Sequence, residues 1–549
     1  MTRWLAAIVA LACSVQTAAA DSYKDFRAQM RRLDKQERAY WEAYNNRFVK
    51  ACATFYKKRD KRHKQRAVDG DFGEFRILYE ECASIEKLRG EACLAFARSG
   101  HAKATSALFK TLLQTTLEVD KTEEQLREGN NRVYAGIFDQ RPGVRRHGLA
   151  FRERLLADAL TAAPGDAKVF GEWGFGRARK QDAKRRTATA RVAWLDIVGA
   201  RRERACRPVV VLNLASKDPR LRIAALEALV LFGAEARKDL LPLLNDQQPV
   251  VRRALLAAVR RDAATDPLWI GPVLDFFAAT AGLPRADALQ TLKVLTGRDL
   301  GDDPKPWRAW YEEHQAAIEG GNFERPASPE IGPEVLEPKT VAFYEIRTPS
   351  DRILFMLDGS WALQVPAETE VLKQRHWWHW QRSDWTDEHE SNQDVLVRQT
   401  RKALGQLQSS ARFRILMVGH HSNKEDVIGL FPEKKALQPD ARSRKRASEY
   451  LAGYKYSWIN YDPHYALMRA LELEDVDTVF LVYNGHLSGC RYLLPEALVA
   501  DFQRRNRFHR LVLHAVRIGD TGPESGKLLK GLAASSGGTY VWSNVPPVE

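Results

Sequence analysis

The spacing of apolar and polar positions predicts a helical N-terminal region. Over residues 21–135 apolar side chains recur at three-, four- and seven-residue steps, which is the period of one helical face. The positions that follow this period are Phe26, Met30, Leu33, Tyr40, Trp41, Tyr44, Phe48 and Phe55. We therefore expect long amphipathic helices, within a helical region that covers residues 21–186.

Two basic runs lie inside this region. "KKRDKRHKQR" at residues 57–66 predicts a solvated helix end, with a patch for an anionic surface as the alternative. "RARKQDAKRR" at residues 177–186 follows the glycine-rich "FGEWGFG", so it predicts an exposed linker between helical units. On the alternative interpretation, such basic segments hold an acidic partner or the cell envelope.

From about residue 187 the sequence repeats itself. "LASKDPRLRIAALEAL" at residues 214–229 aligns with "LNDQQPVVRRALLAAV" at residues 244–259, and Pro219 matches Pro249. Proline suits the first position of a helix, where its missing N–H would be unpaired anyway. The pattern resembles HEAT-type helical repeats over residues 187–319, which implies units stacked into a solenoid.

Two tryptophans and a proline-rich stretch mark the end of the repeats. Trp307 and Trp310 lie in "LTGRDLGDDPKPWRAWYEEH", where we expect them to cap the stack. Residues 320–339 then contain four prolines, a density that excludes a helix and predicts a linker.

Beyond the linker, apolar runs predict strands that alternate with helices. This alternation predicts a parallel sheet with helices on both faces, an α/β doubly wound domain whose ligand site lies at the carboxyl ends of the strands. The chain is thus expected to be multidomain, with an α-helical and α-solenoid region before the α/β domain. We expect strands at residues 352–357, 413–418, 477–483, 510–516 and 538–542, and helices at about 392–408, 441–452, 462–473, 495–507 and 525–535.

Residues 340–549 resemble a von Willebrand factor type A (vWA) domain along nearly their full length. "RILFMLDGS" resembles the first strand with its metal-site loop, and "FRILMVGHHSN" resembles the second strand. "VDTVFLVYNGHLSG" resembles the strand that usually ends in "SDG", and "LKGLAASSGGTYVW" resembles the common ending of the family. The resemblance implies a Rossmann-like fold. Helical repeats followed by such a domain also resemble secreted bacterial proteins.

The resemblance implies a degenerate metal site. In this family an Asp-x-Ser-x-Ser loop, a Thr and an Asp hold Mg²⁺ through oxygen ligands. Asp358 and Ser360 match the first loop, but Ala362 replaces its second serine. Ser457 is the hydroxyl that could stand in for the Thr, and Asn484 replaces the Asp. We expect this site to hold no metal, and bound Mg²⁺ is the alternative.

An insertion at residues 361–390 lies between the first strand and its helix. It gathers Trp361, Trp377, Trp378, Trp380 and Trp385 with His376 and His379. Indoles bury a large area and still need a partner for the N–H group, which predicts a lid or a protein interface. A platform for glycans or other ligands and a zinc site are the alternatives.

The N-terminal residues and the charge bear on location and partners. Residues 1–20 combine Arg3, an apolar run and small residues, the pattern of a secretory signal peptide, with acylation at Cys13 as the alternative. We expect export to the periplasm or the exterior of a bacterium, and no transmembrane span. The formal net charge of +15 suits an acidic protein partner, whereas export disfavours nucleic acid.

The cysteines and the absence of catalytic motifs complete the expectations. Outside the cytoplasm, a disulfide among Cys52, Cys82 and Cys93 is favoured. No nucleophile elbow, phosphate loop or HExxH motif occurs in the sequence. We therefore expect an exported protein–protein interaction scaffold and no enzyme. The alternative is an envelope enzyme or a glycan-binding protein whose site lies at His376 and His379 in the insertion.

Overall fold

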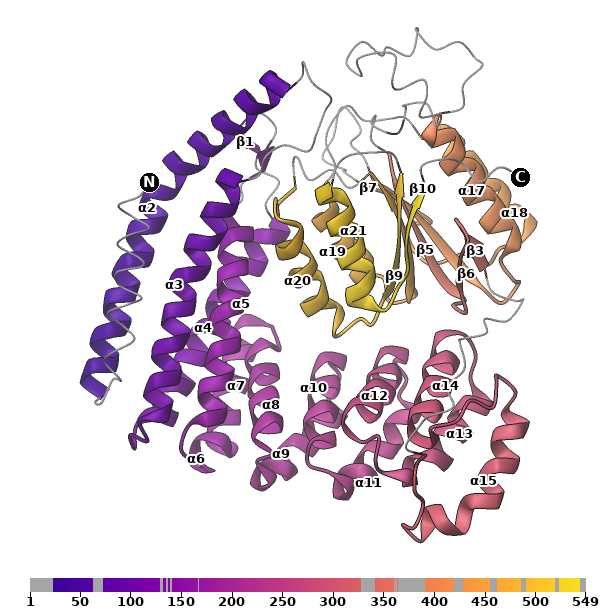
Figure 1. Ribbon diagram of the computed structural model, residues 1–549, viewed down its shortest axis with the longest axis horizontal. Coiled ribbons are helices and arrows are strands. Elements are labelled where there is room, and N and C mark those ends of the chain that lie inside the picture. Colours follow the sequence, from indigo (N-terminus) through magenta and orange to yellow (C-terminus); the bar gives the residue numbers. More distant parts are fainter. Residues whose placement is uncertain are drawn as a thin grey trace.

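The chain folds into a helical N-terminal region and a C-terminal domain built on a six-stranded mixed sheet. The computed structural model describes residues 23–62, 73–128, 132–134, 137–138, 141–165, 167–326, 341–359, 363, 391–418, 428–454, 462–484, 490–518 and 523–543. Figure 1 shows the helices as an arch, with the sheet domain on its inner side. The predicted signal peptide, residues 327–340 and all of the insertion except Leu363 lie outside the described residues.

Long helices open the described chain, as the sequence predicts. The apolar face of the first helix is confirmed, because Tyr40, Tyr44 and Phe48 are buried and contact one another in succession. No helix of the described residues is both long and apolar enough to cross a bilayer. The elements are α2 (Tyr23–Arg62), α3 (Gly73–Arg98), α4 (Ala104–Glu128), β1 (Arg132–Tyr134), β2 (Ile137–Phe138), α5 (Arg141–Ala162), α6 (Ala167–Phe170), α7 (Glu172–Arg185) and α8 (Thr189–Arg201).

The second basic run is helical and not a linker, which corrects the prediction for residues 177–186, whereas most of its basic side chains are exposed as expected. It belongs to helix α7. The Asp182 carboxylate is buried and accepts hydrogen bonds from the backbone N–H groups of Ala190 and Arg191. One of the preceding glycines, Gly174, misled the prediction because it serves close packing. A Cβ on Gly174 would lie 1.8 Å from the carbonyl oxygen of Val169.

Shorter helices follow in regular succession. Pro219 and Pro249 occupy the first turns of two matching helices, as the alignment of the two segments predicts. Arg222 then donates hydrogen bonds at 2.8 and 2.9 Å to Asp246 of the next unit. The helices are η1 (Arg204–Cys206), α9 (Arg207–Leu212), η2 (Asn213–Ala215), α10 (Pro219–Val230), η3 (Ala234–Ala236), α11 (Arg237–Leu240), η4 (Leu241–Asn245), α12 (Pro249–Asp262), η5 (Pro267–Trp269), α13 (Ile270–Ala279), α14 (Gly282–Thr296) and α15 (Pro304–Glu319).

The two tryptophans predicted to close this series are buried in α15. The indole N–H of Trp307 donates to the carbonyl oxygen of Gly301 at 2.8 Å. Trp310 stacks on His314 with a centroid separation of 4.5 Å. Both indoles therefore anchor the last described helix before the linker.

The C-terminal domain alternates strands and helices, and all five predicted strands and five predicted helices form. The sheet order is β10-β9-β8-β5-β6-β7, and every neighbouring pair is parallel except β6 with β7. The antiparallel edge strand β7 and a small β3–β4 pair were not predicted. The elements are β3 (Val341–Phe343), β4 (Ile346–Thr348), β5 (Arg352–Asp358), α17 (Asn392–Gln406), β6 (Arg412–Val418), β7 (Ile428–Phe431), α18 (Ala441–Gly453), α19 (Pro463–Leu471), β8 (Thr478–Tyr483), α20 (Pro495–Asn506), β9 (Val512–Ile518), α21 (Pro523–Ser536) and β10 (Tyr540–Ser543).

Both faces of the sheet are buried, as continuous apolar strands predict. Because side chains alternate along a strand, Leu354 and Met356 of β5 join one core with α19, α20 and α21. Ile353 and Phe355 join the opposite core with α17 and α18. The first of these cores also contains Tyr40 and other aromatic side chains of α2 and α3, so the helical region and the sheet domain share one apolar core.

The predicted disulfide does not form. Cys52, Cys82 and Cys93 are free and buried. Cys82 and Cys93 lie on the same helix, separated by about 16 Å of helical rise, which a disulfide cannot span. Cys52 packs with Cys82 in one core, whereas Cys93 belongs to another. Burial raises the pKa of Cys52 and Cys93 to about 12, so these thiols stay protonated at neutral pH.

His514 of β9 makes stability depend on pH. It is 5% exposed, stacks on Phe480, and accepts a hydrogen bond from the Thr539 N–H at 3.0 Å through Nδ1. Burial lowers its pKa from 6.5 to about 4. Below the ordinary value, the unfolded chain binds a proton that the folded chain excludes, so stability falls as the pH drops toward 4.

We expect His514→Asn to flatten this dependence, because asparagine keeps an acceptor for Thr539 but does not titrate. Between about pH 7 and about pH 4.5, wild type should lose about 2–3 kcal/mol more unfolding free energy than the variant. Urea denaturation at several pH values measures this difference. Equal losses in the two proteins would contradict the assignment to His514.

Candidate functional site

The parallel strands end together at one side of the sheet. Asp358 of β5 lies opposite Val418 of β6, and Tyr483 of β8 lies opposite Arg517 of β9. We call this side the carboxyl edge, defined by the last residues of β5, β6, β8 and β9. In the sheet, β5 has β6 as its neighbour on one side and β8 on the other, so the strand order runs outward from β5 in both directions. Asp358 and Asn484 therefore meet where the strand order reverses.

The structure brings these two sequence-predicted residues into contact. The backbone N–H of Asn484 donates to Oδ2 of Asp358 at 3.3 Å, and both side chains are buried. The N–H of Gly359 donates to the carbonyl oxygen of Val418 at 2.7 Å. These contacts hold the Asp358 carboxylate at the carboxyl edge. Ser360 and Ser457, the other two predicted ligands, lie outside the described residues.

Tyr454, just beyond α18, covers this part of the edge. A Cβ on Gly359 would lie 2.4 Å from the Tyr454 ring, so the ring approaches the backbone as closely as a glycine allows. Burial, the neighbouring Tyr450 and the Asp358 carboxylate all raise the pKa of Tyr454. A neutral phenol therefore lies beside Asp358 at neutral pH.

The described residues of the edge fit Mg²⁺ poorly. Among the residues that the structure describes, no group of three or more His, Cys, Asp or Glu side chains could hold a metal ion. Asn484 offers a neutral side-chain amide where the resemblance calls for a carboxylate, and the backbone N–H of Asn484 already occupies one oxygen of Asp358. Mg²⁺ favours charged oxygen ligands in near-ideal octahedral geometry, which this pair does not supply.

A buried polar network flanks the edge, and the sequence analysis did not anticipate it. Asp462 accepts hydrogen bonds from the N–H of His464 and from the thiol of Cys490, at 3.1 and 3.2 Å. His464 Nε2 lies 3.2 Å from Asp501 Oδ2. Burial, followed by the charge of Asp462, raises the pKa of the Cys490 thiol well above its ordinary value. A protonated thiol is a poor nucleophile, so this cluster holds the segment before α20 rather than a reacting group.

The opposite side of the sheet faces the helical region (Figure 1). We call it the amino edge, defined by the first residues of β5, β6, β8 and β9. Gly282 at the start of α14 lies so close to it that an added Cβ would be 2.9 Å from Oδ1 of Asp351. Ser350 donates at 2.5 Å to the buried Asp477, which directly precedes β8. The helical region therefore covers the amino edge, and it also contacts the segment between β8 and α20 beside the carboxyl edge.

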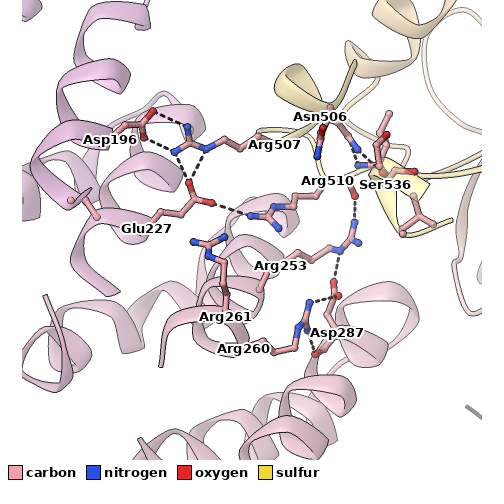
Figure 2. A pocket seen from close by; sticks show the side chains of 18 of the residues that line it. Asp196, Glu227, Arg253, Arg260, Arg261, Asp287, Asn506, Arg507, Arg510 and Ser536 are labelled. Carbon is pink, nitrogen blue, oxygen red and sulfur yellow. Dashed lines mark hydrogen bonds and ion pairs between the residues drawn. The ribbon is translucent and has the colours of Figure 1, made fainter. Parts of the chain in front are cut away.

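A cleft of about 680 Å³ lies between the helical region and the turn that joins α20 to β9. Figure 2 shows the charged side chains that converge on it from both parts of the chain. We call it the arginine cleft, after five residues of its lining: Arg253, Arg260, Arg261, Arg507 and Arg510.

Ion pairs across the arginine cleft join the two parts. Arg507 donates to Asp196 at 2.6 and 2.8 Å and to Glu227 at 2.6 and 2.8 Å. Arg510 donates to Glu227 at 3.1 Å. Arg253 donates to the carbonyl oxygen of Arg510 at 2.5 Å. Two residues of the sheet domain are thus held by three side chains of the helical region.

The turn that presents these arginines has a defined local cause. Asn506 ends α20 and exchanges two hydrogen bonds of 2.8 Å with the backbone of Leu511. This bridge closes the turn and holds Arg510 at a φ of 56°, a left-handed conformation that arginine rarely adopts. The sequence signal is the basic run "RRNRFHR" at residues 504–510. Its acidic partners, Asp196 and Glu227, lie 311 and 280 positions before Arg507 and could not be predicted from it.

Further contacts join α3, α4 and α5 to the sheet domain. The N–H of Leu493 donates to the hydroxyl of Tyr79 at 3.4 Å. Arg505 forms an ion pair with Glu123. A Cβ on Gly143 would lie 2.4 Å from the carbonyl oxygen of Arg491, so α5 touches the backbone of the sheet domain.

The predicted recognition surface in the insertion lies outside the described residues. That surface comprises Trp361, Trp377, Trp378, Trp380 and Trp385 with His376 and His379, and its interpretation stays a prediction. In comparisons with known proteins, the chain matches no protein-family model and no curated protein.

Proposed function

We propose that the chain is an exported protein-interaction scaffold whose vWA-like domain binds a protein partner at the carboxyl edge. The observation that carries this proposal is the orientation of the sheet. Its amino edge is held against the helical region through the arginine cleft, and the carboxyl ends of β5 and β6, with Asp358, lie at the opposite side of the sheet from that cleft. The exported location rests on the signal-peptide pattern of residues 1–20.

The strand order supports a vWA-like, Rossmann-like domain. Numbered along the chain from β5, the order β7-β6-β5-β8-β9-β10 is the doubly wound order 3-2-1-4-5-6. Open α/β sheets bind their ligands outside the carboxyl ends of the strands, where the order reverses. Asp358 and Asn484 lie at that point.

The helical region supports the second half of the proposal, a HEAT-like solenoid. Pro219 and Pro249 begin equivalent helices, and the ion pair between Arg222 and Asp246 joins one unit to the next. Stacked units of this kind form extended, stiff frames. The frame holds the vWA-like domain in one orientation.

We propose that partner binding needs no metal. A vWA-type metal site binds a partner's carboxylate through the open position of Mg²⁺. Here the side-chain amide of Asn484 replaces a carboxylate, and the backbone N–H of Asn484 already occupies one oxygen of Asp358. The tryptophans of the insertion supply an apolar contact area instead, since indoles contribute strongly to protein interfaces.

The test is capture of partners from an envelope extract with purified wild type and with Trp377→Ala/Trp378→Ala. We expect wild type to retain a specific partner equally in Mg²⁺ and in EDTA, and the double variant to lose it at least about tenfold, or about 1.4 kcal/mol. Loss of the partner in EDTA would contradict metal-free binding. An unchanged partner set in the double variant would contradict the role of the insertion.

A further inference from the structure

We propose that the arginine cleft binds a small ligand that carries an oxyanion group, either phosphate or carboxylate. This goes beyond partner binding at the carboxyl edge, because the cleft lies at the opposite side of the sheet. Its volume of about 680 Å³ falls within the range of about 300–1,000 Å³ that is typical of small-molecule sites.

The charges of the cleft are unequal. Its five arginines face three carboxylates, those of Asp196, Glu227 and Asp287. Each carboxylate already has partners. Asp196 binds Arg507, Glu227 binds Arg507 and Arg510, and Asp287 binds Arg253 and Arg260. The lining therefore holds two more positive than negative charges, with every acidic group engaged, and the excess is one when Asp262, which pairs with Arg261 from outside the lining, is counted.

The excess gathers around Arg510. Figure 2 shows the guanidinium groups of Arg261 and Arg510 near one another, with no ion pair drawn between Arg261 and the acidic residues of the cleft. The guanidinium group of Arg253 lies between the carbonyl oxygen of Arg510 and Asp287. Nε of Arg510 is buried and has no hydrogen-bond partner. Arg261 pairs instead with its neighbour Asp262, at 2.7 Å.

The lowered pKa of Arg510 also indicates an excess of positive charge in the cleft. Burial lowers its pKa, and the charges of Arg253 and Arg261 lower it further, against the opposing effect of Glu227 and Asp287. An oxyanion in the cleft would accept from the exposed donors of Arg261 and Arg510 and offset the repulsion among the arginines, and the guanidinium fork matches phosphate and carboxylate oxygens.

Ligand binding should also strengthen the contact between the two parts of the chain. Arg253 and Arg261 come from α12, whereas Arg510 precedes β9. A ligand that binds both Arg261 and Arg510 can do so only when the sheet domain is packed against the helical region. It therefore stabilises the folded chain by mass action, and the melting temperature should rise with ligand concentration.

The experiment titrates the full-length protein with pyrophosphate and with citrate, at an ionic strength held constant with sodium chloride. Isothermal calorimetry and the melting temperature are the readouts. We expect saturable binding of at least one anion: pyrophosphate alone indicates a phosphate ligand, and citrate alone indicates a carboxylate ligand. Binding of neither anion would overturn the proposal.

Two matched variants separate the cleft from the general positive charge of the chain. Arg261→Gln changes an exposed side chain and should weaken binding at least about tenfold without altering the unliganded fold. Arg204→Gln removes an equally charged, exposed side chain outside the cleft and should leave binding unchanged. Equal weakening in both variants would show non-specific attraction and would overturn the proposal.

Discussion

Arg152→Met is expected to lower the unfolding free energy by about 3–5 kcal/mol, because it breaks a buried ion pair. The Arg152 side chain is 2% exposed, and it donates to both carboxylate oxygens of Glu86, at 2.5 and 2.6 Å. It also donates to Glu118 at 2.8 Å. Glu86 is itself 3% exposed, so the substitution leaves a buried charge without its bidentate partner. Urea denaturation followed by circular dichroism measures the loss.

Three further variants test this explanation. Arg152→Lys keeps the positive charge but loses the bidentate guanidinium contact with Glu86, so its unfolding free energy should lie between those of wild type and Arg152→Met. Adding Glu86→Gln to Arg152→Met should restore part of the stability, because the buried charge is then absent. Arg469→Met breaks an exposed pair with Glu472 and should cost less than about 1 kcal/mol. A loss in Arg152→Met as small as that in Arg469→Met would contradict the explanation.

Gly143→Ala is expected to weaken the packing of the sheet domain against the helical region and to lower the free energy of unfolding by about 2–3 kcal/mol. The new Cβ would lie 2.4 Å from the carbonyl oxygen of Arg491. Because that atom belongs to the backbone, no side-chain rotation relieves the clash and the two parts must move apart. The neighbouring hydrogen bond from the Leu493 N–H to Tyr79 should break, so hydrogen exchange at the Leu493 amide should speed up.

Gly405→Ala is the matched control. Gly405 lies in helix α17, and an added Cβ there would meet nothing within 4 Å. Alanine favours a helix over glycine by up to about 1 kcal/mol, so this variant should be as stable as wild type or slightly more so. If Gly143→Ala behaved like Gly405→Ala, the close contact between α5 and the sheet domain would be wrong.

The sheet domain could be predicted from the sequence because its signals are local. Strands buried on both faces read as short, continuous apolar runs, and β5, β6 and β8 lie within a residue or two of the predicted ranges. The meeting of Asp358 with Asn484 follows from parallel strands that end at one edge. The edge strand β7 was missed because it is four residues long and pairs antiparallel, without a helix before it.

The features that were missed depend on contacts between distant segments. Nothing local in "RRNRFHR" indicates that Arg507 binds Asp196 and Glu227, because those partners come from a different part of the chain. The free cysteines were mispredicted because export favours disulfides in general, whereas helix geometry keeps Cys82 from Cys93. The glycines before residue 177 indicated a linker, yet Gly174 permits close packing at the start of α7.

The central claim is that a protein partner binds the carboxyl edge of the sheet, and site-specific photo-crosslinking tests it most directly. A benzophenone amino acid replaces Ala452, which is exposed near the end of α18 beside Tyr454, or Ser409, which is exposed before β6 at the amino edge. We predict that the captured partner crosslinks to the Ala452 probe at least about tenfold more than to the Ser409 probe, with and without EDTA. Equal crosslinking at the two probes, or stronger crosslinking at Ser409, would contradict the claim.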